Sequence, residues 1–572
     1  MSESSTATVR HTEPFNWFAG LYWPALIIAT LYVCYFSHLG VVGLVGPDEP
    51  RYAWIARAMA ESGDWVTPRL YDQPWFEKPP LYYWGAALSF ELFGVNEAAA
   101  RLPSAVAALL GTLALAWLAW KIYGGKTARW LLLLLPTTVG MIGFSHAAAT
   151  DMPFSGMLTM AMVAAAVLLG LRSAEREANI SLVFQPQWKL TLARISFGVA
   201  LALAVLAKGP AALILCGGTI FFWSLVTKRW RDSLRLLHPL AVAAFLIAAV
   251  PWYLICQQQN RDFFRIFILE HNFQRYLTPQ FQHVQPFWFY LPIVAAAWLP
   301  WTTLVAWSIW QGLAKLRQTK RISDSSVFFL SWTLFCIAFF SLSQSKLPGY
   351  ILPALLPLAL LVAQSYTVIE ERSKAFQLIH LLAALLLAML FTGLEVAAPH
   401  VSRKGIEFGM AVGFIVAAIS SANLILGGAS AAGKFGRVRE LAATLSVVPI
   451  LLVLLFSNRL TASLFNGDPS GKRIATDLQA LRIPEERLFI SGLNRGEHYG
   501  LNFYLHQEVP EWDEHTPAWG YVVAKSKRCG ALVPTGWSCE EIPLGTQIRD
   551  RSVYRINRAG SLPGAAGGGK FQ

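Results

Sequence analysis

The chain has 572 residues, of which 55% are hydrophobic and 14% are charged, and its mean hydropathy is +0.44. A soluble globular protein carries about 25% charged residues. The composition therefore excludes an ordinary soluble enzyme, a coiled coil and a disordered chain, and it indicates a protein that crosses a membrane several times. The net charge of +13 suggests a nucleic-acid partner, but net charge alone does not identify a partner.

Apolar segments long enough to cross a bilayer recur along the chain. Backbone polar groups must be satisfied internally in hydrocarbon, so each such segment is expected to be helical. The first follows a polar stretch and has no small-residue cleavage site after it, so we interpret it as a span and not as a cleaved signal peptide. The window rule predicts about thirteen transmembrane helices, near residues 22–44, 102–120, 130–147, 152–171, 194–208, 210–227, 237–256, 288–310, 327–344, 350–366, 376–397, 406–427 and 441–458.

The apolar segment 80–93 is different, because it is short and contains Glu91. Its larger apolar residues fall on one side of a helix. We therefore expect a helix that lies in the membrane interface. The residues on that side are Leu81, Trp84, Leu88 and Leu92.

The cations are unevenly distributed between the connecting segments. If the N-terminus is cytoplasmic, the short inner loops carry most of them, which is the positive-inside pattern. Topology then explains the excess charge, and we expect no nucleic-acid partner. Three longer polar segments face outward: 45–101, 257–287 and 459–560. The inner loops contain Lys121, Lys126, Arg129, Arg172, Arg176, Lys228, Arg229, Arg231, Arg235, Lys315, Arg317, Lys320, Arg321, Arg372, Lys374, Lys434, Arg437 and Arg439.

The chain is expected to form two domains. Residues 1–458 make a transmembrane domain with outer loops 45–101 and 257–287, and residues 459–560 make a small α/β domain on the outer side. Residues 561–572 are a glycine-rich tail that we exclude from the fold. The sequence of the outer domain predicts one helix, 470–481, and short strands at 487–491, 501–505, 521–524 and 553–556.

The six cysteines separate into two groups. Four lie in predicted spans, where a thiol behaves as a small apolar side chain. Cys529 and Cys539 both lie in the outer domain, and a disulfide between them is expected if that compartment is oxidising. The four in the spans are Cys34, Cys216, Cys256 and Cys336.

Charged residues gather where the outer segments meet the predicted membrane, and such residues are costly there unless they serve a function. Asp48, Arg51 and Tyr52 are spaced i, i+3, i+4, so a helix that begins here presents all three on one face. Asp48 can also act simply as the N-cap of that helix, with Pro50 in its first turn. The two roles are compatible.

Further outer charges follow in two more motifs. Glu77 and Lys78 precede the interfacial helix, where a lysine often extends to the membrane surface without any other role. Asp151 lies between two spans, and a simple helix cap is nearly as good an explanation for it. Contact with phospholipid head groups would need only the basic residues. Because acidic residues are interleaved with them, we favour a substrate-binding site.

Three more cations lie at the same predicted face. Lys208 and Lys346 occupy outer turns, and Arg275 lies in the second outer segment. Arginine can bind a phosphate with two hydrogen bonds, and lysine supplies a compact charge. The set therefore indicates an anionic substrate at the membrane surface.

These motifs resemble the C-type glycosyltransferases of the protein O-mannosyltransferase-like superfamily, which use polyprenyl-phosphate sugars. Among them the sequence is most similar to the bacterial aminoarabinose transferases. The similarity covers roughly residues 20–365, and only the general layout agrees beyond them. Seven short motifs in the same order carry it: Pro-Asp-Glu-x-Arg-Tyr-Ala at 47–53, Phe-Glu-Lys-Pro at 76–79, Thr-Asp-x-Pro-Phe at 150–154, Lys-Gly at 208–209, His-x-x-x-Arg at 271–275, Pro-Phe-Trp-Phe-Tyr at 286–290 and Lys-Leu-Pro-x-Tyr-Ile at 346–351.

The resemblance implies a C-type glycosyltransferase fold in the bacterial inner membrane, with the active site in the periplasm. It implies transfer of 4-amino-4-deoxy-L-arabinose from undecaprenyl phosphate to lipid A phosphates, which gives polymyxin resistance. A monomer is expected. Alternatives are another sugar, a protein Ser/Thr acceptor, or a flippase without chemistry. The cations gather at one face, whereas a transporter has charges at the midplane, so a flippase fits less well.

The resemblance also assigns roles to residues. Asp48 is the catalytic acid, Asp151 supports it, and Lys78 acts on the leaving phosphate. No cofactor is required by this family, so any bound divalent metal, such as zinc, is structural. Its ligands are Glu77 and His271, with His498 of the outer domain as a third. The residues around the phosphate and lipid are Arg51, Tyr52, Tyr82, Lys208, Arg275, Lys346 and Tyr350.

Overall fold

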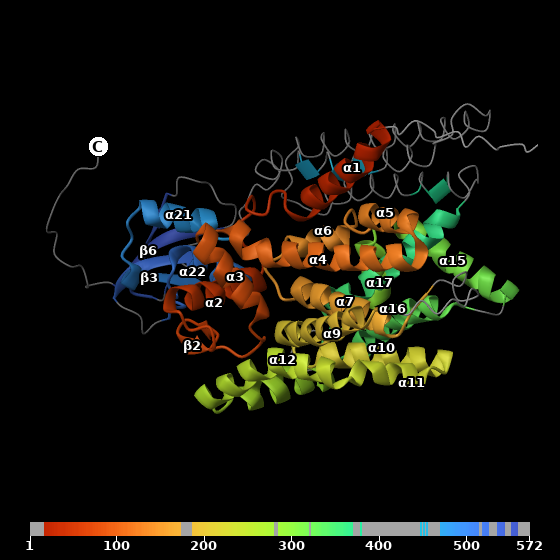
Figure 1. The fold of residues 1–572 in the computed structure, drawn as a ribbon. Coiled ribbons are helices and arrows are strands. Elements are labelled where there is room, and N and C mark those ends of the chain that lie inside the picture. The colour runs from red at the N-terminus through yellow and green to blue at the C-terminus, as the bar shows by residue number, and fades with distance from the viewer. Residues whose placement is uncertain are drawn as a thin grey trace, which may run out of the picture.

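The computed structural model describes residues 17–172, 186–278, 284–319, 322–369, 470–513, 518–525, 535–543 and 551–558, together with a few isolated positions. Long helices lie side by side in a bundle, and a small domain with a sheet lies at one end of it beside α2 and α3 (Figure 1). The predicted combination of a helical membrane domain and a small α/β domain is confirmed.

Within the described residues, six helices are long and apolar enough to cross a membrane. Two bent helix pairs and two shorter apolar helices correspond to further predicted spans. The predicted spans 376–397, 406–427 and 441–458 lie outside the described residues except for isolated positions. The helices are α1 (Trp17–Tyr35), α4 (Glu97–Tyr123), α5 (Gly125–Leu134), α6 (Val139–Ser145), α7 (Asp151–Leu168), α9 (Gln187–Lys208), α10 (Ala211–Thr227), α11 (Trp230–Ser233), η1 (Leu234–Leu237), α12 (Pro239–Gln259), α14 (Tyr290–Ala297), α15 (Thr302–Thr319), α16 (Asp324–Leu342), η4 (Pro348–Ile351) and α17 (Leu352–Val368).

Two predicted spans are not single helices. α5 and α6 meet at 65°, and α14 and α15 meet at 114°. A proline follows the first helix of each pair, Pro136 and Pro300, and proline interrupts a helix because it lacks an N–H group. The two breaks are joined, since Trp301 Nε1 donates to Thr137 Oγ1 at 2.9 Å.

The first predicted outer segment is compact. It contains α2 (Asp48–Ser62), a short hairpin of β1 (Arg69–Leu70) and β2 (Gln73–Pro74), and α3 (Leu81–Phe93). With 13 residues, α3 is too short to span a bilayer. Leu88 and Leu92 of its predicted apolar side are exposed, which suits a helix in the interface.

The second predicted outer segment is helical over most of its described length. A π-helix, η2 (Arg265–Gln274), continues into α13 (Arg275–Leu277). Phe263 and Phe267 are stacked just before and within it, and they pack with Phe76 of the first outer segment in one apolar cluster. The two outer segments therefore lie against one another.

The C-terminal domain has a four-stranded sheet in the order β3-β4-β6-β5. β3 and β4 are parallel, and the other pairs are antiparallel. The prediction of a strand at 501–505 is wrong, because these residues end α22, whose capping box joins Asn494 and Glu497. β5 was not predicted. The elements are α21 (Lys472–Ala480), η5 (Glu485–Arg487), β3 (Leu488–Ser491), α22 (Arg495–Leu505), β4 (Trp519–Ala524), β5 (Trp537–Ile542) and β6 (Ser552–Arg558).

The cysteines follow the predicted division as far as the structure describes them. The four in predicted spans are buried free thiols. Cys539 is disulfide-bonded. Cys529 lies outside the described residues, so its pairing with Cys539 stays a prediction.

The C-terminal domain packs directly on the first outer segment. Asn502 Nδ2 donates to Tyr71 Oη at 2.8 Å, and His506 Nε2 lies 3.0 Å from Glu61 Oε2. Phe503 belongs to the apolar core of α2 and α3. The three segments that the sequence placed on the outer side thus meet at one end of the bundle.

Candidate active site at the end of the helical bundle

The first pair of the site lies at the N-terminus of α2. Arg51 Nη2 is 2.5 Å from Asp48 Oδ1, as the i, i+3 spacing predicted. Asp48 forms no capping hydrogen bond, because the N-cap position is Pro47. The interpretation of Asp48 as only a helix cap is therefore wrong, and its side chain, 48% exposed, remains accessible beside a buried guanidinium.

Glu77 is the centre of the cation cluster. Its carboxylate lies 3.1 Å from Arg51 Nη2, 3.1 Å from Arg275 Nη1 and 3.4 Å from Lys78 Nζ. These residues come from α2, from the segment after β2 and from α13. Phe76 anchors the middle segment by packing among Trp252 and Phe263. The structure thus brings together three of the five cations that the sequence assigned to the anionic substrate.

A second ion pair joins α7 to α9. Asp151 is the first residue of α7, Lys208 is the last residue of α9, and their side chains form an ion pair. Lys208 Nζ also lies 4.2 Å from the centroid of the Tyr350 ring. Gly349 allows the Asp151 side chain to lie close to the backbone before Tyr350, because a Cβ at position 349 would be 2.8 Å from Asp151 Cγ. The N-cap residue of α7 is Thr150 and not Asp151, and the Asp151 carboxylate is paired with Lys208.

Three aromatic rings lie near the guanidinium of Arg51, and the sequence predicted only one of the three as part of the site. The guanidinium carbon is 5.4 Å from the ring of Trp75 and 5.8 Å from the ring of Tyr499, which belongs to α22. The expected Tyr52 ring is at 5.2 Å. Such contacts stabilise a cation in a dry environment. No motif pointed to Tyr499, since it lies far along the chain in the other domain.

Two predicted binding residues donate to backbone carbonyl groups. Tyr82 is fully buried, and its hydroxyl donates to the carbonyl of Ala100 at 2.8 Å, so it is a core residue. Lys346 donates to the carbonyl of Ser343 at 2.5 Å. Among the described residues, Lys346 forms no ion pair with the acids of the site. The assignment of Tyr82 is therefore corrected, because its hydroxyl is buried and bonded to the backbone, whereas substrate binding by Lys346 stays a prediction.

The predicted metal ligands do not form a ligand set. Among the described residues no three His, Cys, Asp or Glu side chains are arranged to hold a metal ion. Glu77 is surrounded by cations, which oppose a further positive ion. His498 Nε2 instead hydrogen-bonds the carbonyl oxygen of Val509 at 2.9 Å. The described side chains therefore do not form a three-ligand group, and metal binding by Glu77, His271 and His498 stays a prediction.

Burial and charge shift the pKa values of the site in opposite directions. Burial would raise the pKa of Glu77, but Lys78, Arg51, Arg275 and His271 outweigh it and hold that pKa well below its usual range. Burial lowers the pKa of Lys78 to about 8, against the opposing effect of Glu77. Glu77 is thus firmly ionised, whereas Lys78 titrates near physiological pH.

The pKa values of two neighbouring groups also shift. Burial lowers the pKa of His271, and Glu77 opposes that shift. Partial burial raises the pKa of Asp48, and Arg51 opposes it. His271 is therefore protonated less readily than a free imidazole, and the permanent cations near Glu77 are arginines.

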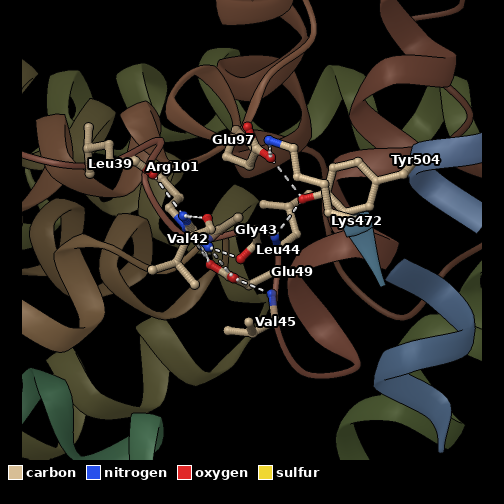
Figure 2. Close-up of polar contacts among 12 residues, drawn as sticks. Leu39, Val42, Gly43, Leu44, Val45, Glu49, Glu97, Arg101, Lys472 and Tyr504 are labelled. Atoms are coloured by element: carbon tan, nitrogen blue, oxygen red, sulfur yellow. Dashed lines mark hydrogen bonds and ion pairs between the residues drawn. The ribbon is translucent and has the colours of Figure 1, made fainter. Parts of the chain in front are cut away.

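A buried ion pair behind the site was missed by the sequence analysis. Arg101 binds both oxygens of Glu49, at 3.0 and 2.7 Å, and donates to the carbonyls of Leu39, Val42 and Gly43 (Figure 2). Glu49 accepts from the amides of Val45 and Ala148. The pair therefore joins the segment before Asp48 to the segment before Asp151. In the sequence, the one indication of this ion pair was the position of Glu49 next to Asp48.

Comparisons with known proteins agree with this geometry. Residues 22–267 match the family described as dolichyl-phosphate-mannose-protein mannosyltransferase. The chain is 35% identical over 344 residues to undecaprenyl phosphate-alpha-4-amino-4-deoxy-L-arabinose arabinosyl transferase of Pseudomonas aeruginosa strain UCBPP-PA14, a match that covers 60% of this chain and 59% of the relative. It is 33% identical over 343 residues to the same-named protein of Erwinia tasmaniensis, covering 59% and 58%. The matches thus span about three fifths of these relatives.

A solved structure extends the comparison to nearly the whole chain. The crystal structure of ArnT from Cupriavidus metallidurans bound to undecaprenyl phosphate matches with a TM-score of 0.73 and 24% identity, over 93% of this chain and 98% of that one. The likeness includes the helical bundle and the C-terminal domain. The chain therefore has the fold of ArnT, which is a C-type glycosyltransferase fold.

Proposed function

We propose that this protein transfers 4-amino-4-deoxy-L-arabinose from undecaprenyl phosphate to phosphate groups of lipid A. The observation that carries the proposal is the arrangement of Arg51, Lys78 and Arg275 around Glu77. It lies in the fold of a protein whose crystal structure is described as bound to undecaprenyl phosphate. The names of the relatives supply the sugar.

The cations act on the leaving phosphate. The bond between the anomeric carbon and a phosphate oxygen of the donor breaks, and the undecaprenyl phosphate gains negative charge. Preorganised cations aimed at developing charge lower the barrier, and this contribution is usually the largest in such sites. The described cluster contains four cations and three carboxylates, namely Arg51, Lys78, Lys208, Arg275, Asp48, Glu77 and Asp151. Because the cations are in excess, the cluster stabilises the leaving phosphate as its negative charge grows.

The acceptor needs no strong base. A phosphate monoester has a second pKa near 6, so it is already an anionic nucleophile at pH 7. A new bond forms between its oxygen and the anomeric carbon as the old bond breaks, and no proton is released. A single displacement inverts the anomeric centre. Asp48, accessible and paired with Arg51, orients the substrates and binds the ammonium group of the sugar.

The orientation follows from the same proposal. The end of the bundle that holds Asp48, Glu77 and the C-terminal domain faces the periplasm, where the lipid-linked sugar and lipid A meet at the inner-membrane surface. The exposed Arg231 loop lies on the cytoplasmic side. We also propose that the protein works as a monomer.

A reconstituted assay tests the proposal. Purified protein is incubated with undecaprenyl-phosphate-aminoarabinose and lipid A, and the lipid A is examined by mass spectrometry. We expect the mass of one aminoarabinose to be added. A synthetic Ser/Thr peptide is the competing acceptor, and modification of the peptide alone would contradict the proposal.

Two variants locate the chemistry. Asp48→Asn removes one charge at nearly constant shape, and Lys78→Ala removes one cation from Glu77. Each is expected to lower transfer by about a hundredfold or more, the usual effect of one preorganised contact. Arg231→Ala is the control, because Arg231 is exposed. Wild-type transfer, or wild-type polymyxin survival of a deficient strain, by both site variants at normal protein levels would place the active site elsewhere.

A further inference from the structure

Tyr504 stands at the junction between the two domains. It belongs to α22, and its hydroxyl accepts the amide N–H of Leu44 at 2.8 Å and donates to Glu97 Oε1 at 3.0 Å (Figure 2). Lys472 of α21 donates to the same Glu97 oxygen at 2.5 Å. One hydroxyl thus connects the C-terminal domain, the start of α4 and the segment that leads to Asp48.

That segment has little regular structure of its own. Residues 43–45 lie outside any helix or strand, and Arg101 binds the carbonyls of Leu39, Val42 and Gly43. Among the described residues, the Leu44 amide is bonded to the Tyr504 hydroxyl and to no backbone carbonyl. Leu44 is fully buried, and a buried amide without a partner is unfavourable. The position of Leu44 therefore depends on Tyr504.

Close backbone contacts on either side strengthen this dependence. Gly43 lies so close to Ser470 that an added Cβ would overlap its side chain. A Cβ on Gly496 of α22 would be 2.9 Å from the carbonyl carbon of Gly46. The C-terminal domain thus touches residues 43–46 along their length, and Asp48 follows two positions later.

We propose that Tyr504 is a positioning residue, whose hydroxyl holds residues 43–46 so that Asp48 begins α2 in the geometry that catalysis requires. The proposal rests on the function proposed above, and it extends the active site to a residue that touches no substrate. The C-terminal domain then acts on the reaction through the backbone.

Tyr504→Phe tests this directly, because the ring stays and the hydroxyl is lost. His506→Asn is the matched control. His506 also bridges the domains, to Glu61 at the other end of α2, and asparagine tolerates its positive φ of 58°. We expect Tyr504→Phe to lower kcat about ten- to hundredfold, since a small misplacement has that effect. His506→Asn should leave kcat unchanged.

Two further measurements distinguish a positioning role of Tyr504 from a contribution to the stability of the contact between the two domains. For Tyr504→Phe the donor KM should stay within about twofold, because no binding group is removed. Hydrogen–deuterium exchange of the peptide 43–49 should become faster in Tyr504→Phe and stay as in the wild type in His506→Asn. Unchanged exchange, or equal activity loss in both variants, would overturn the proposal.

Glu97 supplies a second test. Glu97→Gln keeps an oxygen that accepts from Tyr504, and Glu97→Leu removes it. We expect near wild-type kcat for Glu97→Gln and a loss like that of Tyr504→Phe for Glu97→Leu; the reverse order would contradict the role of the hydroxyl. If wild-type protein transfers no sugar, the proposed function fails, whereas the exchange measurement still decides the role of Tyr504.

Discussion

Glu77 organises the charges of the site. It holds Arg51, Lys78 and Arg275 within hydrogen-bond or ion-pair range, and these cations would otherwise repel one another in a buried setting. A carboxylate at the centre of the proposed phosphate site opposes the charge of a phosphate, but it fixes the cationic side chains before the substrate arrives. Such preorganisation is what lowers a barrier when charge develops on a leaving group.

The pH dependence of transfer should report Lys78. Because burial lowers its pKa to about 8, the free enzyme loses this cation as the pH rises through 8. We expect kcat/KM to fall about tenfold per pH unit above that value, since kcat/KM reports groups of the free enzyme. The measurement is initial transfer rate against pH at low donor concentration.

Two variants should change this alkaline limb of the pH profile in different ways. Glu77 raises the pKa of Lys78, so Glu77→Gln should shift the limb to lower pH. Lys78→Arg should remove it, because arginine stays protonated throughout. A limb that stays in place in Lys78→Arg would show that another group titrates.

Individual residues show what the sequence could predict. Asp48 and Arg51 were predictable, because helical spacing puts them on one face. The hydrogen bonds of Lys346 and Tyr82 were not, because a sequence does not show that a nearby carbonyl accepts their polar groups. Tyr499 reaches Arg51 only through the packing of two domains, which no local pattern records.

At the level of elements, the buried pair Glu49–Arg101 joins α2, α4 and the segments that precede α2 and α7. Its hydrogen bonds satisfy three carbonyls and two amides of irregular backbone. Irregular backbone needs such partners when it is buried. The pair therefore fixes the positions from which both Asp48 and Asp151 extend.

Arg101→Met should destabilise the protein. The substitution leaves Glu49 as a buried charge without its partner, and breaking such a pair costs about 3–5 kcal/mol. We expect a lower midpoint of thermal unfolding in detergent, together with reduced transfer. Arg231→Met, at an exposed position, is the control and should leave the midpoint unchanged. Equal midpoints for the two variants would contradict a stabilising role of the pair.

Element assignments were reliable where the pattern was long. Predicted spans in the described part of the chain correspond to helices or bent pairs, because an apolar run of that length has few alternatives. Residues 501–505 were misassigned as a strand, since five residues do not distinguish periods of 2 and 3.6. The helix there is set by the capping box at Asn494 and Glu497.

For the whole molecule, the decisive feature is that three segments distant in sequence meet at one end of the bundle. The positive-inside distribution predicted that they share one side, and the contacts of Arg275 with Glu77 and of Tyr504 with Leu44 confirm that they adjoin. The distribution also predicts that this side is the periplasm.

Cysteine labelling tests that orientation. Asp72 is exposed in the hairpin of the first outer segment, and Arg231 is exposed at the opposite end. In intact spheroplasts an impermeant thiol reagent should modify Asp72→Cys and spare Arg231→Cys, and both should react after lysis. The opposite pattern would invert the topology.

The bond between Leu44 and Tyr504 joins residues 460 positions apart. During synthesis at about 5–20 residues per second, roughly 20 to 90 s pass between the emergence of the two residues. Throughout that interval the nascent chain has its first catalytic motif but lacks the group that fixes it. On the proposed function, an arrested or prematurely released chain therefore inserts without becoming active, and the proposed transfer activity comes only from molecules whose C-terminal domain has been made and has folded.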